Sequence, residues 1–185
     1  MTDNQPLVVI SDNVPIDIYI LHVEDQPALI SGFGHTLGPR LVTEGQEFHI
    51  SKLVMEEDES SDLWINLIFE RGARRPLRVI YRFCTTEDEF IQIRESWKEL
   101  PVCIVILDVF VGSPEAGTEF FKQIQNQWQD AGKIFYTAFP GTVTKRLGWP
   151  RGDDRLLEKP YDQSRVVDHM SRAVLPFMER LVDKI

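Results

Sequence analysis

The sequence predicts a single α/β domain, residues 1–185, built on a doubly wound parallel sheet. Strand-like segments alternate five times with segments whose apolar residues recur every three or four positions, as they do in helices. One strand, residues 102–107, is apolar throughout and fits the centre of a sheet covered on both faces. Of the 185 residues 43% are hydrophobic, which is enough for one core.

The first expected strand, residues 17–23, precedes an expected helix with Phe33 and Leu37 on its apolar face. Pro27 suits the first turn of this helix, and Gly38-Pro39 is expected to end it.

Residues 40–76 interrupt the alternation and are expected to be an insertion. Two strand-like segments, 48–55 and 63–69, flank the acidic run 56–62, so we expect a β-hairpin with an acidic, solvated tip. Residues 1–16 are expected to form an N-terminal arm, either an edge strand or a packed extension.

The alternation resumes with a strand at 77–83. Thr86 and Glu89 have the spacing of a capping box, which starts a helix that Pro101 ends. Asp162 is expected to cap the last helix, and Pro176 to kink it or break its last turn. The remaining expected strands are 102–107, 133–136 and 155–158. Two further helices are expected: one whose apolar face carries Phe120, Phe121, Ile124 and Trp128, and a short one around 142–149.

Composition excludes several classes of protein. The net charge of −9 is unfavourable for binding a nucleic-acid backbone. No segment approaches the roughly 18 apolar residues of a membrane span, and residues 1–5 do not resemble a signal peptide, so a cytoplasmic protein is expected. Cys84 and Cys103 fall in expected strands and are expected to be buried thiols rather than a disulfide or metal pair.

Acidic, hydroxyl and basic residues stand where the expected parallel strands end. Ligands of open α/β sheets bind at this edge. Three carboxylates there would repel one another, and a hard cation such as Mg²⁺ relieves the repulsion. A lysine and a hydroxyl beside them can hold a phosphoryl group, so the pattern predicts a phosphate-accepting carboxylate. The residues are Glu24 and Asp25 after the first strand, Asp108 after the third, Thr137 after the fourth and Lys159 after the fifth.

These motifs resemble those of the receiver domains of two-component response regulators. The resemblance covers residues 17–184 apart from the insertion. It implies the flavodoxin-like (CheY-like) strand order 2-1-3-4-5, with the hairpin added to five parallel strands. The matching motifs are Val23-Glu24-Asp25, Ile106-Leu107-Asp108, Thr137-Ala138 and Lys159-Pro160.

The resemblance implies a metal site made of side chains and one backbone group. Asp25 would ligate Mg²⁺ directly and Glu24 through water. Asp108 and the backbone carbonyl of Phe110 would complete the protein ligands.

The resemblance also implies how phosphate is held. Asp108 would be the phosphoacceptor, Thr137 would move to hydrogen-bond the phosphoryl group, and Lys159 would pair with it. Lys159-Pro160 is expected to be a cis peptide.

Three positions depart from the receiver pattern. Gly112 stands where proline is common, and Gly117 comes one position later than usual, so the loop after Asp108 is expected to differ in shape. Leu156 replaces the Tyr or Phe that turns inward on activation in many receivers, which weakens the expected coupling to Thr137.

The expected function is a phosphorylation-switched receiver, not an enzyme acting on a separate substrate. It would take a phosphoryl group from a histidine kinase or histidine phosphotransfer protein. It would signal to an unknown protein, or dimerise, through the face formed by 142–149, 155–158 and the last helix. The alternative is a pseudo-receiver that binds a partner constitutively and takes no part in phosphotransfer. An aspartate-nucleophile phosphatase is disfavoured, because the position of its usual second aspartate is Phe110.

Phe110 and Phe139 stand two residues after Asp108 and Thr137, where side chains flank the approach of water. Neither ring can orient a water molecule, and both can exclude one. The sequence therefore predicts a slowly hydrolysing phospho-aspartate.

Overall fold

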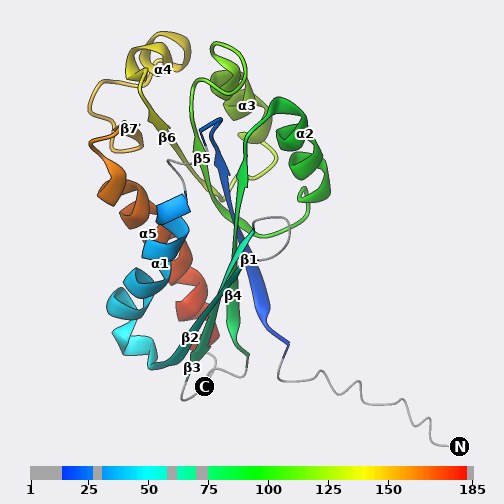
Figure 1. Cartoon of the computed structure of the whole chain (residues 1–185), viewed down its shortest axis with the longest axis vertical. Helices are drawn as coiled ribbons and strands as arrows, with labels where there is room; N and C mark the ends of the chain where they lie inside the picture. Colours follow the sequence, from blue (N-terminus) through cyan, green and yellow to red (C-terminus); the bar gives the residue numbers. More distant parts are fainter. Residues whose placement is uncertain (1–13, 27–30, 58–61, 70–74, 183–185) are drawn as a thin grey trace, which may run out of the picture.

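A mixed sheet of seven strands, in the order β2-β3-β4-β1-β5-β6-β7, organises the domain (Figure 1). The computed structural model describes residues 14–26, 31–57, 62–69 and 75–182. Numbered among themselves in chain order, the parallel strands β4-β1-β5-β6-β7 have the predicted order 2-1-3-4-5. The strands are β1 (Ile16–Val23), β2 (Ile50–Glu57), β3 (Leu63–Phe69), β4 (Leu77–Cys84), β5 (Val102–Leu107), β6 (Gly132–Thr137) and β7 (Leu156–Glu158).

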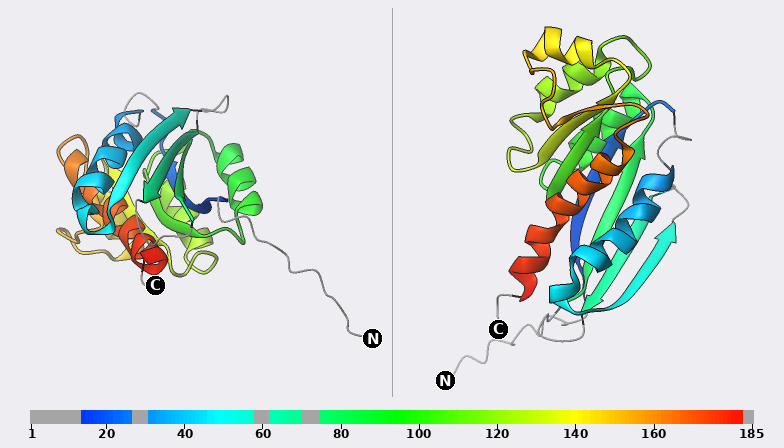
Figure 2. Two further views of the ribbon diagram at one scale, coloured as in Figure 1. Left: turned by 90° about the horizontal axis from the view of Figure 1, so that it is seen from below. Right: turned by 90° about the vertical axis from the view of Figure 1, so that its left-hand side faces the viewer.

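Helices cover both faces of the parallel strands (Figures 1 and 2). Successive side chains of β1 enter opposite layers: Ile18 and Ile20 join the cluster under α1 and α5, and Leu21 and Val23 join the cluster under α2 and α3. Cys84 and Cys103 are free and buried, as predicted. The helices are α1 (Ser31–Glu44), α2 (Glu87–Ser96), α3 (Ala116–Ile124), α4 (Pro140–Leu147) and α5 (Gln163–Val182).

The predicted hairpin is present and lengthens the sheet beyond β4. β2 pairs antiparallel with β3, which pairs antiparallel with β4. The first hairpin strand begins at Ile50, not at residue 48, because Phe48 belongs to a short 3-10 helix, Gln46–Phe48, and packs into the core. Glu56 and Glu57 lie in β2 rather than in the loop. Residues 58–61 of the expected acidic tip and residues 1–13 of the expected arm lie outside the described residues.

α1 does not end at Gly38-Pro39, contrary to the prediction, but continues to Glu44. The turn beyond Pro39 carries Leu41, which is fully buried, and this burial offsets the cost of a proline inside the helix. A Cβ on Gly38 would lie 2.9 Å from Met55 Sδ, so this glycine permits close packing against β2 rather than marking a helix end. Residues 40–44, expected in the insertion, therefore belong to α1.

Two other helix ends also differ from the predictions. α2 ends at Ser96, whereas the sequence predicted that Pro101 would end it. α5 continues through Pro176 to Val182, so its last turn is not broken, and Met178, just beyond the proline, is fully buried. No helix among the described residues is both long and apolar enough to cross a membrane.

One of the two hydrogen bonds of the predicted capping box of α2 is formed as expected. The Thr86 hydroxyl accepts a hydrogen bond from the backbone N–H of Glu89 at 3.2 Å. The Glu89 carboxylate accepts from the backbone N–H of Thr85 at 2.7 Å, one residue before the expected partner. At α5, the Asp162 carboxylate accepts from the backbone N–H of Glu158 at 2.8 Å and from the Arg165 guanidinium at 3.2 Å, and neither of these is a capping bond to a backbone N–H of the first turn.

Candidate functional site

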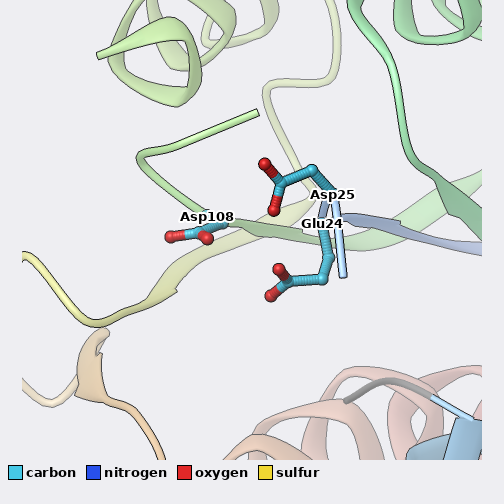
Figure 3. Close-up of side chains that lie close together, drawn as sticks. All are labelled: Glu24, Asp25 and Asp108. Carbon is cyan, nitrogen blue, oxygen red and sulfur yellow. The ribbon is translucent and has the colours of Figure 1, made fainter. Parts of the chain in front are cut away.

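Three carboxylates meet where β1 and β5 end side by side (Figure 3). Val23 and Leu107 are paired in the parallel register, and the backbone N–H of Asp108 donates to the Val23 carbonyl at 2.9 Å. The residues that follow these strands are therefore held together. One oxygen from each of Glu24, Asp25 and Asp108 lies within 4.8 Å of the others.

Lys159 reaches this cluster from the end of β7. Its ammonium donates to the Glu24 carboxylate and, at 2.8 Å, to Asp108 Oδ2. The backbone N–H of Lys159 donates to the carbonyl of Thr137, and the Lys159-Pro160 peptide is cis, as predicted. The structure thus brings together the ends of four parallel strands, β1, β5, β6 and β7.

The cluster is short of positive charge. Glu24 is 1% exposed and Asp108 5% exposed. The pKa of Glu24 is raised, mainly because the side chain is buried. The hydrogen bond and charge of Lys159 oppose this shift, and the negative charge of Asp108 adds to it. Among the described residues a single ammonium, that of Lys159, faces the three carboxylates, which leaves two negative charges in excess when all three are ionised.

The donor set fits a hard divalent cation. Asp25 Oδ1 is buried and has no hydrogen-bond partner among the residues that the structure describes. An uncompensated carboxylate oxygen is costly away from water, and a cation bound by Asp25, Asp108 and Glu24 would compensate it.

A surface depression of about 370 Å³ gives access to the cluster. Asp25, Asp108, Phe110 and Lys159 line it, whereas Glu24 lies beneath it. The residues that complete the lining are Gln26, Ala138, Phe139 and Pro160.

Thr137 lies at the expected strand end, but its side chain does not line the depression. It is fully buried, and its hydroxyl accepts from the backbone N–H of Phe139 at 3.1 Å. The hydroxyl would have to leave this hydrogen bond in order to reach a group on Asp108.

Two aromatic rings stand beside the depression. Phe110 is 38% exposed and Phe139 50% exposed, and their ring centroids are 5.3 Å apart. They are among the few large hydrophobic side chains exposed in the described residues. Their position beside Asp108 and Lys159 places apolar surface at the mouth of the site.

Two of the departures from the receiver pattern, Gly112 and Leu156, have structural explanations. Gly112 has a φ of +72°, which proline cannot adopt, so the loop after Asp108 requires a residue such as glycine. Leu156 is buried in the same apolar cluster as Phe135 and Trp149, so the position beside β6 is filled without an aromatic ring.

Two residues next to the cluster were not identified from the sequence. His22 is buried, its Nδ1 lies 2.7 Å from the Tyr81 hydroxyl, and burial, with a contribution from Lys159, lowers the pKa of His22 to about 3. Tyr136 places its ring 5.5 Å from the Lys159 ammonium. The signal for His22 is its strand periodicity, because it alternates with Ile18 and Ile20 on one face of β1, and Glu24 continues that alternation just after the strand.

The order of the parallel strands decides the fold. The order 2-1-3-4-5, with helices on both faces, is the flavodoxin-like arrangement, which CheY has. The chain has the fold of a receiver domain.

Solved receiver structures are similar to this chain at low sequence identity. The non-phosphorylated HemR receiver domain of Leptospira biflexa is 17% identical with a TM-score of 0.47, over 84% of this chain and 93% of that one. The PhyR receiver domain of Erythrobacter litoralis is 21% identical with a TM-score of 0.46, over 85% and 89%. The response regulator LqsR of Legionella pneumophila is 13% identical with a TM-score of 0.49, over 91% and 47%. No family model and no curated protein sequence matches the chain.

Proposed function

We propose that the protein is a phosphorylation-switched receiver in which Asp108 accepts a phosphoryl group. The observation that carries this proposal is the cluster of three carboxylates and one ammonium, in which Glu24 and Asp108 are buried and Asp25 Oδ1 has no hydrogen-bond partner among the described residues. A site with unmet negative charge beside a lysine suits the binding of a cation together with an anion.

The proposed donor is a phosphohistidine on a histidine kinase or a histidine phosphotransfer protein. A carboxylate oxygen of Asp108 attacks phosphorus and forms a P–O bond while the P–N bond breaks. The imidazole leaves with the electron pair of that bond and takes a proton from solvent.

Each neighbouring group has a role in this reaction. When bound by Asp25, Asp108, the Phe110 carbonyl and, through water, Glu24, Mg²⁺ would neutralise charge on the transferring oxygens. Lys159 already lies 2.8 Å from Asp108 Oδ2 and would pair with the phosphoryl group. Thr137 would rotate out of its hydrogen bond with Phe139 and donate its hydroxyl to the same group.

The proposed output is binding of a downstream protein through the face formed by α4, β7 and α5. Lys159 directly follows β7 and Thr137 is the last residue of β6, so a movement at the site can reach α4 and β7 through the chain itself. The protein would act as a signalling domain rather than as an enzyme that turns over a separate substrate.

A constitutive pseudo-receiver is the second candidate, and Leu156 is the observation that favours it. Its aliphatic side chain fills the buried space beside β6, so no aromatic hydroxyl is available there to couple Thr137 to the surface.

Beryllofluoride, which mimics a phosphoryl group on aspartate, distinguishes these functions. Backbone amide NMR spectra would be compared with and without beryllofluoride and Mg²⁺, for the wild type and Asp108→Asn. The switch predicts shifts at Thr137 and in α4, β7 and α5 that Asp108→Asn abolishes. Shifts confined to residues 24–26 and 108–110, or no shift at all, would contradict the switch and support the pseudo-receiver.

A further inference from the structure

β2 is the outermost strand of the described sheet at the end opposite β7. It has eight residues, Ile50–Glu57, and β3 is its strand neighbour on one side. Among the described residues no strand pairs with its outer side. Such an edge presents unpaired backbone N–H and C=O groups that can pair with another strand. The other edge strand, β7, has three residues and offers a much shorter surface.

The side chains of β2 are arranged differently on its two faces. Leu53 and Met55 face α1 and pack against the core. Lys52, Val54 and Glu56 lie on the opposite face, where Lys52 and Glu56 are exposed and Val54 is half-buried.

The charges of β2 run from basic at its start to acidic at its end. If two copies of β2 pair antiparallel with Val54 opposite Val54, Lys52 of each copy lies opposite Glu56 of the other. Leu53 then lies opposite Met55, which continues the apolar layer under α1 from one copy to the next. A parallel pairing in register would instead set Glu56 against Glu56, which is unfavourable.

We propose that two copies of this chain associate through β2, antiparallel and centred on Val54, so that their sheets form one continuous sheet. The arrangement has two-fold symmetry and uses the same surface on both copies. Charge complementarity of β2 with itself identifies the occupant of this edge as a second copy. The proposal is independent of phosphate acceptance, because β2 belongs to the hairpin and not to the strands that carry the site.

Charge reversal tests the pairing. The wild type is expected to dimerise at micromolar concentrations in sedimentation velocity experiments. Lys52→Glu and Glu56→Lys each place like charges opposite one another twice and are expected to weaken the dimer on the order of tenfold or more. The double variant Lys52→Glu/Glu56→Lys restores opposite charges and is expected to recover the dimer, because the register is preserved.

Disulfide trapping tests the register. Residues directly opposite one another in antiparallel strands have Cα atoms about 4.5–5.5 Å apart, within the range of a disulfide. Val54→Cys is therefore expected to form a covalent dimer under mild oxidation. Lys52→Cys is the matched control, since four residues of offset separate the two copies of position 52 by roughly 14 Å. The native thiols do not interfere, because Cys84 and Cys103 are both buried.

Three results would overturn the proposal. The first is a wild type that stays monomeric at concentrations of hundreds of micromolar. In that case Lys52 would instead prevent the edge strand from pairing with another chain. The second is a dimer unaffected by the single charge reversals, which would place the contact elsewhere, for example on α4, β7 and α5. The third is cross-linking of Val54→Cys and Lys52→Cys at equal rates, which would indicate random collision. Circular dichroism melting curves confirm that each variant is folded.

Discussion

The carboxylate of Glu24 is buried, and this burial makes the free energy of unfolding depend on pH. Burial raises the pKa of Glu24 above its ordinary value of 4.5, although Lys159 opposes the shift. The folded state therefore holds the Glu24 proton more tightly than the unfolded chain does. Its contribution to stability is complete below the unfolded pKa and is lost as the pH rises through the folded pKa.

Replacing Glu24 by glutamine removes this titration. In the presence of a chelator, the free energy of unfolding of Glu24→Gln is expected to rise relative to the wild type as the pH increases above about 4.5. The relative gain is about 1.4 kcal/mol for each pH unit between the unfolded and folded pKa values. Urea denaturation over a pH series measures it.

Asp153 supplies a control of opposite sign. The hydrogen bond and charge of Arg155 lower the pKa of Asp153, so its contribution is present above the unfolded pKa and is lost as the pH falls. Asp153→Asn is expected to lose stability relative to the wild type as the pH rises. A difference between Glu24→Gln and the wild type that does not change with pH would contradict the account of Glu24.

Phe110 and Phe139 are expected to prolong the life of a phosphoryl group on Asp108. Both rings lie at the mouth of the site, and neither has a group that can position a water molecule for attack. The double variant Phe110→Asn/Phe139→Glu supplies such groups and should shorten the lifetime of the phosphorylated protein. Decay of the phosphorylated mass after removal of the donor measures this, and equal lifetimes would rule out the role of the rings.

At the scale of elements, the local sequence pattern predicted the strands, but it did not predict where the helices end. The apolar run before Asp108 and the alternation in β3 define strands in the sequence itself, and the structure has them at or near the predicted bounds. Gly38-Pro39 and Pro176 are local signals for helix ends, and both were outweighed by burial of Leu41 and Met178 against other elements. Such long-range burial is not visible in a local window of sequence.

α1 lies so close to the sheet that one of its glycines cannot be replaced without displacing a neighbour. A Cβ on Gly34 would lie 2.4 Å from Leu63 Cδ2 and 3.1 Å from Tyr81 Cδ1. Gly34→Ala is expected to lower the free energy of unfolding by about 1–3 kcal/mol, the usual cost of overpacking.

Gly32, two residues earlier in the same helix, is the matched control. Nothing lies within 4 Å of the Cβ it would carry, so Gly32→Ala is expected to gain up to about 1 kcal/mol from the better helix propensity of alanine. Both variants are compared by urea denaturation at one pH. Stabilisation of both would show that α1 has room to move away from the sheet.

At the scale of the whole molecule, parallel strands bring distant residues to one edge. This is why the sequence could place Glu24, Asp25, Asp108 and Lys159 together although 135 positions separate the first from the last. The rule does not give side-chain orientation, so the burial of the Thr137 hydroxyl and the position of the Tyr136 ring near Lys159 were not predicted. It also does not give the pairing of the inserted hairpin with β4, which depends on contacts outside the alternating pattern.

The most direct test of the central claim is intact-protein mass spectrometry after incubation with acetyl phosphate. The account predicts that the wild type gains the mass of one phosphoryl group in the presence of Mg²⁺, that a chelator prevents the gain, and that Asp108→Asn shows none. A wild type that gains no mass with Mg²⁺ present, or an Asp108→Asn variant that gains as much, would contradict it.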